Sequence, residues 1–242
     1  MPGGQLFGLM LLPSAAVIGA GVFGGAVSLT RLWRSAVQHL AAGVVFAAIA
    51  TEIVPGVIHG GAPGAAIAGF ATGVAAMFAM RWLAERLEAR DAGRAELPLG
   101  FLAAVSIDCV IDGVVIGTGF AVGARQGLLV SAALTLEMFF LGLATADTMR
   151  GGGARLQTVL ATCTGLAAIL GVSSIVGYLL LAGAPPVVLT ALLAFGSAAL
   201  LYLVTEELLV RAHDLGETRL VTSLFFLGFL IVFAAELLAV PR

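Results

Sequence analysis

The chain has 242 residues, of which 60% are hydrophobic and only 11% are charged. Because soluble domains carry about 25% charged residues, this composition excludes a water-soluble globule. The net charge of −2 and the lack of a basic cluster in the sequence argue against a nucleic-acid partner. Long apolar runs are typical of helices that cross a bilayer, so the sequence predicts an all-α integral membrane protein.

Eight hydrophobic segments are predicted to cross the membrane, and they form a single transmembrane domain over residues 1–242. No positively charged residue precedes the first segment, which favours a spanning helix over a cleaved signal peptide. In chain order, the predicted spans are 5–29, 36–58, 62–83, 99–122, 126–149, 156–182, 186–210 and 219–240.

The arginines orient these spans. Ten of the twelve arginines fall at odd-numbered connections or at an adjoining helix end, whereas only Arg125 and Arg242 fall on the opposite side. The positive-inside rule then predicts a multi-pass protein of the cell membrane with both termini outside.

Glycines recur at the small-xxx-small spacing that lets membrane helices approach closely, as in Gly69/Gly73 and Gly113/Gly117. We expect these pairs to pack helices together. The same faces would also allow a homodimer.

One motif occurs twice. Thr51-Glu52 is followed by His59, and Thr205-Glu206 by His213, with the histidine eight residues after the threonine in both cases. The second span is expected to run outward and the seventh inward, so the repeat would be inverted, as in many secondary transporters.

Carboxylates lie inside the apolar spans, where an ionised acid needs a partner, a proton or a cation. Asp108 and Asp112 straddle the middle of the fourth span and, at i,i+4, share one helical face. Glu137 lies at the middle of the fifth span, which a short connection makes an antiparallel neighbour. We therefore expect these three carboxylates to converge at the bilayer midplane. The acids well inside the spans are Glu52, Asp108, Asp112, Glu137, Glu206, Glu207 and Glu236.

Other potential ligands allow two interpretations. Cys109 lies beside Asp108, where it could supply a thiolate or simply fill space between helices. His39 and His59 lie at the two ends of the second span, and a lone histidine in such a place is usually interfacial rather than a ligand.

Four helices resemble those of the ZIP (Zrt/Irt-like) metal transporters. Residues 106–123 resemble the fourth helix of that family, which usually reads His-Asn-x-Pro-Glu-Gly, and residues 136–144 resemble its fifth helix, His-Glu-x-Pro-Glu-Gly. Residues 39–55 and 201–213 are similar to its second and seventh helices. The resemblance implies eight spans, both termini outside, and transport of a divalent metal such as zinc or iron.

The ligand positions depart from the family pattern. Asp108, Cys109 and Asp112 stand where the family has histidine, asparagine and glutamate, and Glu137 takes the histidine position of the fifth helix. The resemblance thus implies one metal site built from Asp108, Asp112 and Glu137.

Most of the family's second metal site is missing, because Met138 and Leu141 replace the two glutamates of the fifth helix. Oxygen-rich donor sets suit manganese, magnesium or calcium, whereas a thiolate from Cys109 would favour zinc, cadmium or ferrous iron. The family resemblance places zinc and other divalent transition metals first.

The leading hypothesis is a carrier that moves a divalent metal toward the cytoplasm, with the metal as substrate and no cofactor. Glu52 and Glu206 or Glu207 would serve as entry or relay ligands. Two alternatives remain: a ZIP-fold sensor that binds metal without transport, and a carrier of protons or another cationic solute.

No motif for metal-dependent proteolysis, serine nucleophile or phosphate binding occurs, so an enzyme is not expected.

Overall fold

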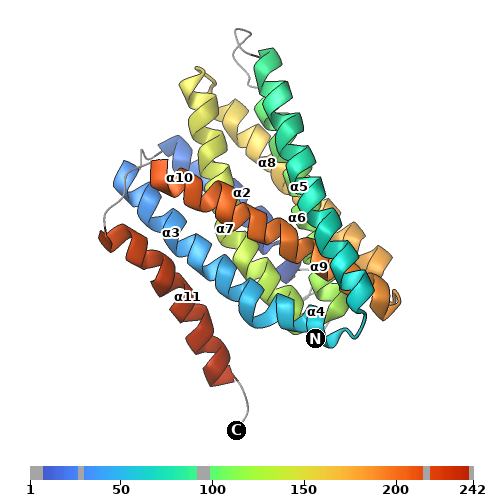
Figure 1. Cartoon of the computed structure of the whole chain (residues 1–242). Coiled ribbons are helices and arrows are strands. Elements are labelled where there is room, and N and C mark those ends of the chain that lie inside the picture. The colour runs from blue at the N-terminus through green and yellow to red at the C-terminus, as the bar shows by residue number, and fades with distance from the viewer. Residues whose placement is uncertain (1–7, 27–29, 92–98, 215–218, 240–242) are drawn as a thin grey trace. The chain divides into compact units, whose positions relative to one another are not determined.

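The computed structural model describes residues 8–26, 30–91, 99–214 and 219–239, and every element in these ranges is a helix (Figure 1). In chain order the elements are α2 (Leu12–Ala26), α3 (Arg31–Ala48), η1 (Ile49–Ile53), α4 (Val54–His59), α5 (Pro63–Asp91), α6 (Leu99–Val122), α7 (Ala124–Gly151), α8 (Leu156–Leu181), α9 (Pro186–Tyr202), η2 (Leu203–Leu208), α10 (Leu209–Asp214) and α11 (Arg219–Ala239). The segments η1 and η2 are π-helical.

Seven helical stretches of the described chain are long and apolar enough to cross a membrane, which confirms the prediction of a multi-pass, all-α membrane protein. They are Arg31–His59, Pro63–Arg86, Gly100–Val122, Ala124–Gly151, Leu156–Leu181, Pro186–Leu208 and Arg219–Leu238.

The predicted count of eight spans is not confirmed. The first apolar helix, Leu12–Gly24, is shorter than the other seven, and residues 5–7 and 27–29 of the predicted first span lie outside the described residues. The chain ends, residues 1–7 and 240–242, also lie outside them, so the placement of both termini stays a prediction.

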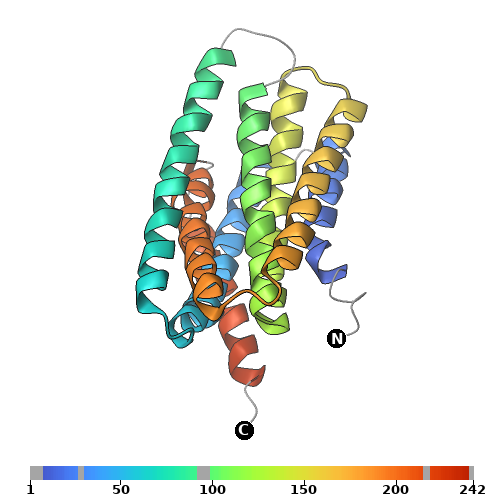
Figure 2. The ribbon, with the colours of Figure 1, turned by 90° about the vertical axis from the view of Figure 1, so that its right-hand side faces the viewer.

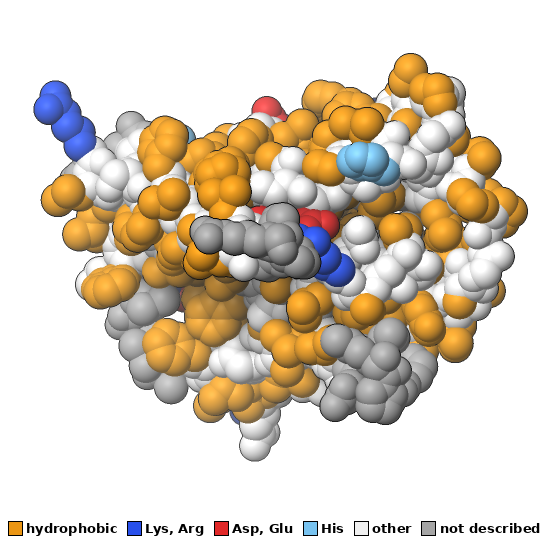
Figure 3. Space-filling view, turned by 90° about the horizontal axis from the view of Figure 1, so that it is seen from below, with side chains coloured by type: hydrophobic (Ala, Val, Ile, Leu, Met, Phe, Trp, Pro, Cys, Tyr) orange, Lys and Arg blue, Asp and Glu red, His pale blue; other side chains and the backbone are white. Residues whose placement is uncertain are grey.

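Many large hydrophobic side chains lie exposed on the surface of the described residues. Figure 3 shows one face, on which hydrophobic side chains predominate and charged ones are few. Large apolar side chains such as Leu220, Ile67 and Leu180 are more than two-thirds exposed. Hydrocarbon, unlike water, solvates such side chains without a free-energy penalty.

The helices group into two compact units whose segments alternate along the chain. Unit 1 comprises Met1–Ser28 and Ala75–Ala184, and unit 2 comprises Leu29–Val74 and Pro185–Arg242. That residues 1–242 form one domain stays a prediction.

In unit 1, α2 packs against α7 and α8, and α6 packs against α8 and α7. Glycine allows the close approach of α2 and α7, since a Cβ on Gly142 would lie 2.8 Å from the carbonyl oxygen of Val17. A hydrogen bond of 2.6 Å from Ser131 Oγ to the carbonyl of Leu9 joins the same two parts of the chain.

In unit 2, two long interrupted helices run antiparallel. The start of the first, α3, packs against α10 at the end of the second, while α4 at the end of the first packs against α9 (Figure 1). This arrangement agrees with the opposite directions predicted for the second and seventh spans. Helix α11 covers α3, where a Cβ on Gly43 would overlap the carbonyl of Phe225.

Both copies of the repeated Thr-Glu motif lie in a π-helical interruption: Thr51-Glu52 in η1 and Thr205-Glu206 in η2. A π-helical turn disturbs the ladder of i→i−4 bonds, and a hydroxyl can satisfy a carbonyl in the preceding turn. The Oγ1 atoms of Thr51 and Thr205 donate to the carbonyls four residues earlier, at 2.9 and 3.0 Å respectively. The sequence repeat is therefore also a structural repeat.

Candidate metal centre

Two neighbouring helices of unit 1 position the acids predicted to bind metal. Asp108 and Asp112 flank the middle of α6, and Glu137 lies at the middle of α7. The two helices are joined at Gly123 and lie side by side (Figures 1 and 2). Antiparallel packing of helices of similar length brings their middles to the same level, as the sequence predicted.

Helix α6 is held in place by glycines next to the acids. A Cβ on Gly113 would lie 2.5 Å from Ser173 Cβ, and one on Gly117 would lie 2.6 Å from the carbonyl oxygen of Ser174. The predicted Gly113/Gly117 pair thus packs α6 directly against the backbone of α8. This close contact with α8 fixes the orientation of α6, and therefore the direction in which the face that carries Asp112 points.

The three carboxylates form one group. A carboxylate oxygen from each of Asp108, Asp112 and Glu137 lies within 4.8 Å of the other two. The side chains are buried, with exposures of 6%, 4% and 3%. Oxygens that bind one cation at about 2.0–2.6 Å can lie up to about 4–5 Å apart, so the spacing suits a shared ion.

Electrostatics favours a cation in this group. Carboxylates so close together and so well buried repel one another when ionised, because little water screens their charges. A bound divalent cation or shared protons relieve that repulsion. The group is therefore compatible with a metal site, at which a metal would compete with protons.

The neighbouring positions make the donor set rich in oxygen. Cys109 is fully buried and close enough to interact electrostatically with the carboxylates, but its sulfur is not part of the group within 4.8 Å. Met138 and Leu141 are buried apolar residues of α7. A second set of carboxylates is not found among the described residues of this helix.

The remaining predicted ligands belong to unit 2. Glu52 is buried in η1, at 8% exposure, whereas Glu206 is exposed and Glu207 half-buried in η2. They are not members of the carboxylate group of unit 1. Their roles as entry or relay ligands stay predictions.

Unit 2 contains a pair of histidines that was not predicted from the sequence. His39 was expected to be a lone, interfacial side chain, but it is 1% exposed, and the centroids of its ring and the ring of His213 lie 5.4 Å apart. The expectation was wrong because α10 covers the start of α3. The inverted repeat could have indicated this pair. Two antiparallel helices bring the N-terminal end of one, which carries His39, beside the C-terminal end of the other, which carries His213.

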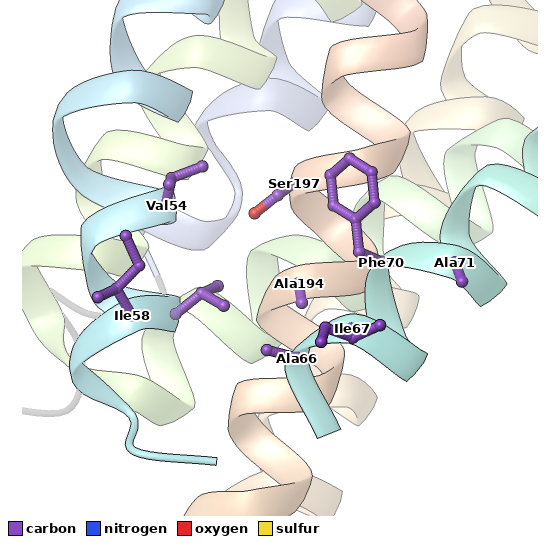
Figure 4. A pocket seen from close by; sticks show the side chains of 9 residues that line it. Val54, Ile58, Ala66, Ile67, Phe70, Ala71, Ala194 and Ser197 are labelled. Carbon is purple, nitrogen blue, oxygen red and sulfur yellow. The ribbon is translucent and has the colours of Figure 1, made fainter. Parts of the chain in front are cut away.

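Unit 2 also contains an apolar cavity of about 400 Å³ between α4, α5 and α9 (Figure 4). Among the described residues that line it, Ser197 alone has a polar side chain, and its hydroxyl donates to the carbonyl of Leu193 at 2.9 Å. The cavity offers no donor set for a cation. Its lining residues are Val54, Val57, Ile58, Ala66, Ile67, Phe70, Ala71, Ala194 and Ser197.

Comparison with known proteins does not assign the chain to a family. The resemblance to ZIP transporters is therefore a proposal, to be judged by the chemistry of the site. No protein-family model and no curated protein match this chain.

Proposed function

We propose that the protein is a membrane carrier for divalent metal cations, with Asp108, Asp112 and Glu137 as the ligands of the transported ion. The observation that carries the proposal is the convergence of these three buried carboxylates, from two helices, within 4.8 Å. Intramembrane acids that meet in this way mark ion pathways far more often than they serve packing alone.

The place of the group along the helices supports transport rather than a purely structural ion. Carriers bind their substrate near the membrane midplane, where one binding site can be exposed to either side in turn. Asp108, Asp112 and Glu137 lie at the middles of two long helices that qualify as membrane spans. An ion bound there would be about halfway across the bilayer.

The donor set supports a divalent ion that accepts oxygen ligands. Three carboxylates carry enough negative charge to compensate a divalent cation, and carboxylate oxygens suit manganese in particular among transition metals. Zinc and iron remain in the proposal because the ZIP-like motifs point to them, and cadmium remains as another divalent transition metal. The selectivity must be measured over all of these ions.

We also propose that the chain is a divergent relative of the ZIP transporters. The motifs of four helices support this. The matched π-helical interruptions of the two antiparallel helices support an inverted repeat, which is common in secondary transporters. Transport would run toward the cytoplasm, with Glu52 and Glu206 or Glu207 along the route.

Uptake into liposomes tests the proposal. The purified protein is reconstituted, and the uptake of zinc, cadmium, manganese, iron, cobalt, magnesium and calcium is compared. We expect saturable uptake of at least one of these ions and loss of most of it in Asp112→Asn, which keeps the shape of the side chain but removes its charge.

Asp147→Asn is the matched control, because Asp147 also lies on α7 but about 15 Å from Glu137 along the helix and is not in the carboxylate group. Its uptake should equal that of the wild type. Metal binding without uptake would instead identify a sensor, and uptake of protons or an organic cation that metals do not inhibit would identify a carrier for another solute.

A further inference from the structure

The imidazoles of His39, on α3, and His213, on α10, form a pair within unit 2, with ring centroids 5.4 Å apart and an angle of 48° between the ring planes. His39 is buried, whereas His213 is exposed. The pair is therefore open to the protein surface on the side of His213. The chain has three histidines in all, and these two are the ones brought together.

Hydrogen bonds define which nitrogen of each neutral ring holds the proton. Nδ1 of His39 lies 2.9 Å from the carbonyl oxygen of Ser35, and Nδ1 of His213 is bonded to the carbonyl of Leu209. Because a carbonyl can only accept, each Nδ1 is the donor, and the lone pair of each neutral ring lies on Nε2. Metal-binding histidines are typically held in this way, with the other ring nitrogen donating to a carbonyl.

The Nε2 atom of His39 has a lone pair that can accept a hydrogen bond or bind a metal ion. It is buried, and it has no hydrogen-bond partner in the part of the chain that the structure describes. A buried nitrogen lone pair without a partner costs free energy. Coordination of a metal ion would remove that cost.

A further hydrogen bond holds the two helices in register. Ser35 Oγ donates to the carbonyl oxygen of Ala212 at 2.8 Å, and both Ser35 and Ala212 are fully buried. This bond joins the turn of α3 before His39 to the residue before His213. The pair is thus positioned by the fold before any ion arrives.

We propose that His39 and His213 bind a transition-metal ion through their Nε2 atoms, in a site separate from the carboxylates of unit 1. With metal–nitrogen distances of about 2.0–2.1 Å and tetrahedral angles, two imidazoles on one ion have ring centroids about 5 Å apart. The observed separation of 5.4 Å fits this geometry. Imidazole donors suit zinc, copper, nickel and iron, with water completing the coordination.

Titration calorimetry with Zn²⁺ on the full chain in detergent micelles tests this site. The background variant Asp112→Asn/Glu137→Gln disables the carboxylate group, so the remaining binding reports the histidines. We expect this background variant to bind Zn²⁺. Adding His213→Gln should weaken the Zn²⁺ affinity by at least about 10- to 100-fold, which is the loss seen when only a hydrogen-bond partner of a metal ligand is replaced. Unchanged binding in His213→Gln would overturn the proposal.

His59→Gln is the matched control. Nδ1 of His59 is bonded to the carbonyl of Pro55 at 2.7 Å, as in the other two histidines, but His59 lies about 30 Å from His39 along the helix. Its substitution should leave Zn²⁺ binding unchanged. Because His213 is exposed, replacing it should not disturb folding.

A second measurement covers the case in which the background variant does not fold. In the otherwise wild-type chain, bound Cu²⁺ should show nitrogen hyperfine structure in its electron paramagnetic resonance spectrum. The splitting should show two coordinated imidazole nitrogens in the wild type and in His59→Gln, and no more than one in His213→Gln. A two-nitrogen pattern that persists in His213→Gln would contradict the site, whatever the carboxylates bind.

Discussion

The hydroxyl of Ser35 donates a hydrogen bond of 2.8 Å to the carbonyl oxygen of Ala212, 177 residues further along the chain. This buried bond links the start of α3 to the end of α10 and lies next to both histidines of the pair. It is a polar contact between the two long antiparallel helices of unit 2.

Ser35→Ala should therefore destabilise the protein. Removal of a buried hydrogen bond costs about 1–3 kcal/mol when an acceptor is left unsatisfied. We expect a lower unfolding temperature in micelles and weaker Zn²⁺ binding at the histidine pair. Ser106→Ala is the control, because the hydrogen bond from Ser106 Oγ to the carbonyl of Leu102, at 2.7 Å, lies within one helix. An equal loss of stability in both variants would contradict the linking role of Ser35.

Gly117→Ala should push α6 away from α8. The new Cβ would lie 2.6 Å from the backbone of both Ser174 and Tyr178, so one helix must move. We expect a loss of about 1–3 kcal/mol in the free energy of unfolding and weaker metal binding, since Asp112 lies on the displaced helix. Gly165→Ala, on α8, places its Cβ in open space and should leave stability unchanged or slightly raised. Equal behaviour of the two variants would exclude close packing as the role of Gly117.

The substitution Leu141→Glu should make the stability of the folded protein depend on bound metal. Leu141 is buried one turn after Glu137 on α7, on the same face. A new carboxylate there should destabilise the metal-free protein by about 2.5–3.5 kcal/mol, and Mn²⁺ or Zn²⁺ should restore the unfolding temperature. Leu143→Glu, a buried position on another face, should be equally destabilised but not rescued by metal. Rescue of both variants, or of neither, would contradict the proposed ion position.

Binding at the carboxylate group should weaken as the pH falls. The three carboxylates must be ionised to bind the cation, so each proton that they hold has to leave on binding. We expect affinity to drop between about pH 7.5 and pH 5.5, with proton release detected by calorimetry in buffers of different ionisation enthalpy. A constant affinity across this range, with no proton release, would show that protons and metal do not share these ligands.

The carboxylate group could be predicted from the sequence because both determinants are local. The i,i+4 spacing of Asp108 and Asp112 fixes their common face, and the short connection between α6 and α7 fixes the level of Glu137. The packing glycines Gly113 and Gly117 were predictable for the same reason.

The histidine pair could not be predicted in this way. His39 and His213 are far apart in sequence, and their proximity depends on how α3 and α10 pack. The π-helical segments were equally hidden, since apolar periodicity does not distinguish a π-helical turn from an α-helical one. The motif repeat did indicate which two helices would correspond.

The most direct test of the central claim is a double-mutant comparison of metal uptake in liposomes. Wild type, Asp112→Asn, Glu137→Gln and the double variant are compared with the ion that the wild type transports best. If the carboxylates share one transported ion, each single substitution should reduce saturable uptake at least about tenfold, and the double variant should be little worse than either. Uptake that survives in either single variant at the wild-type level would contradict the account.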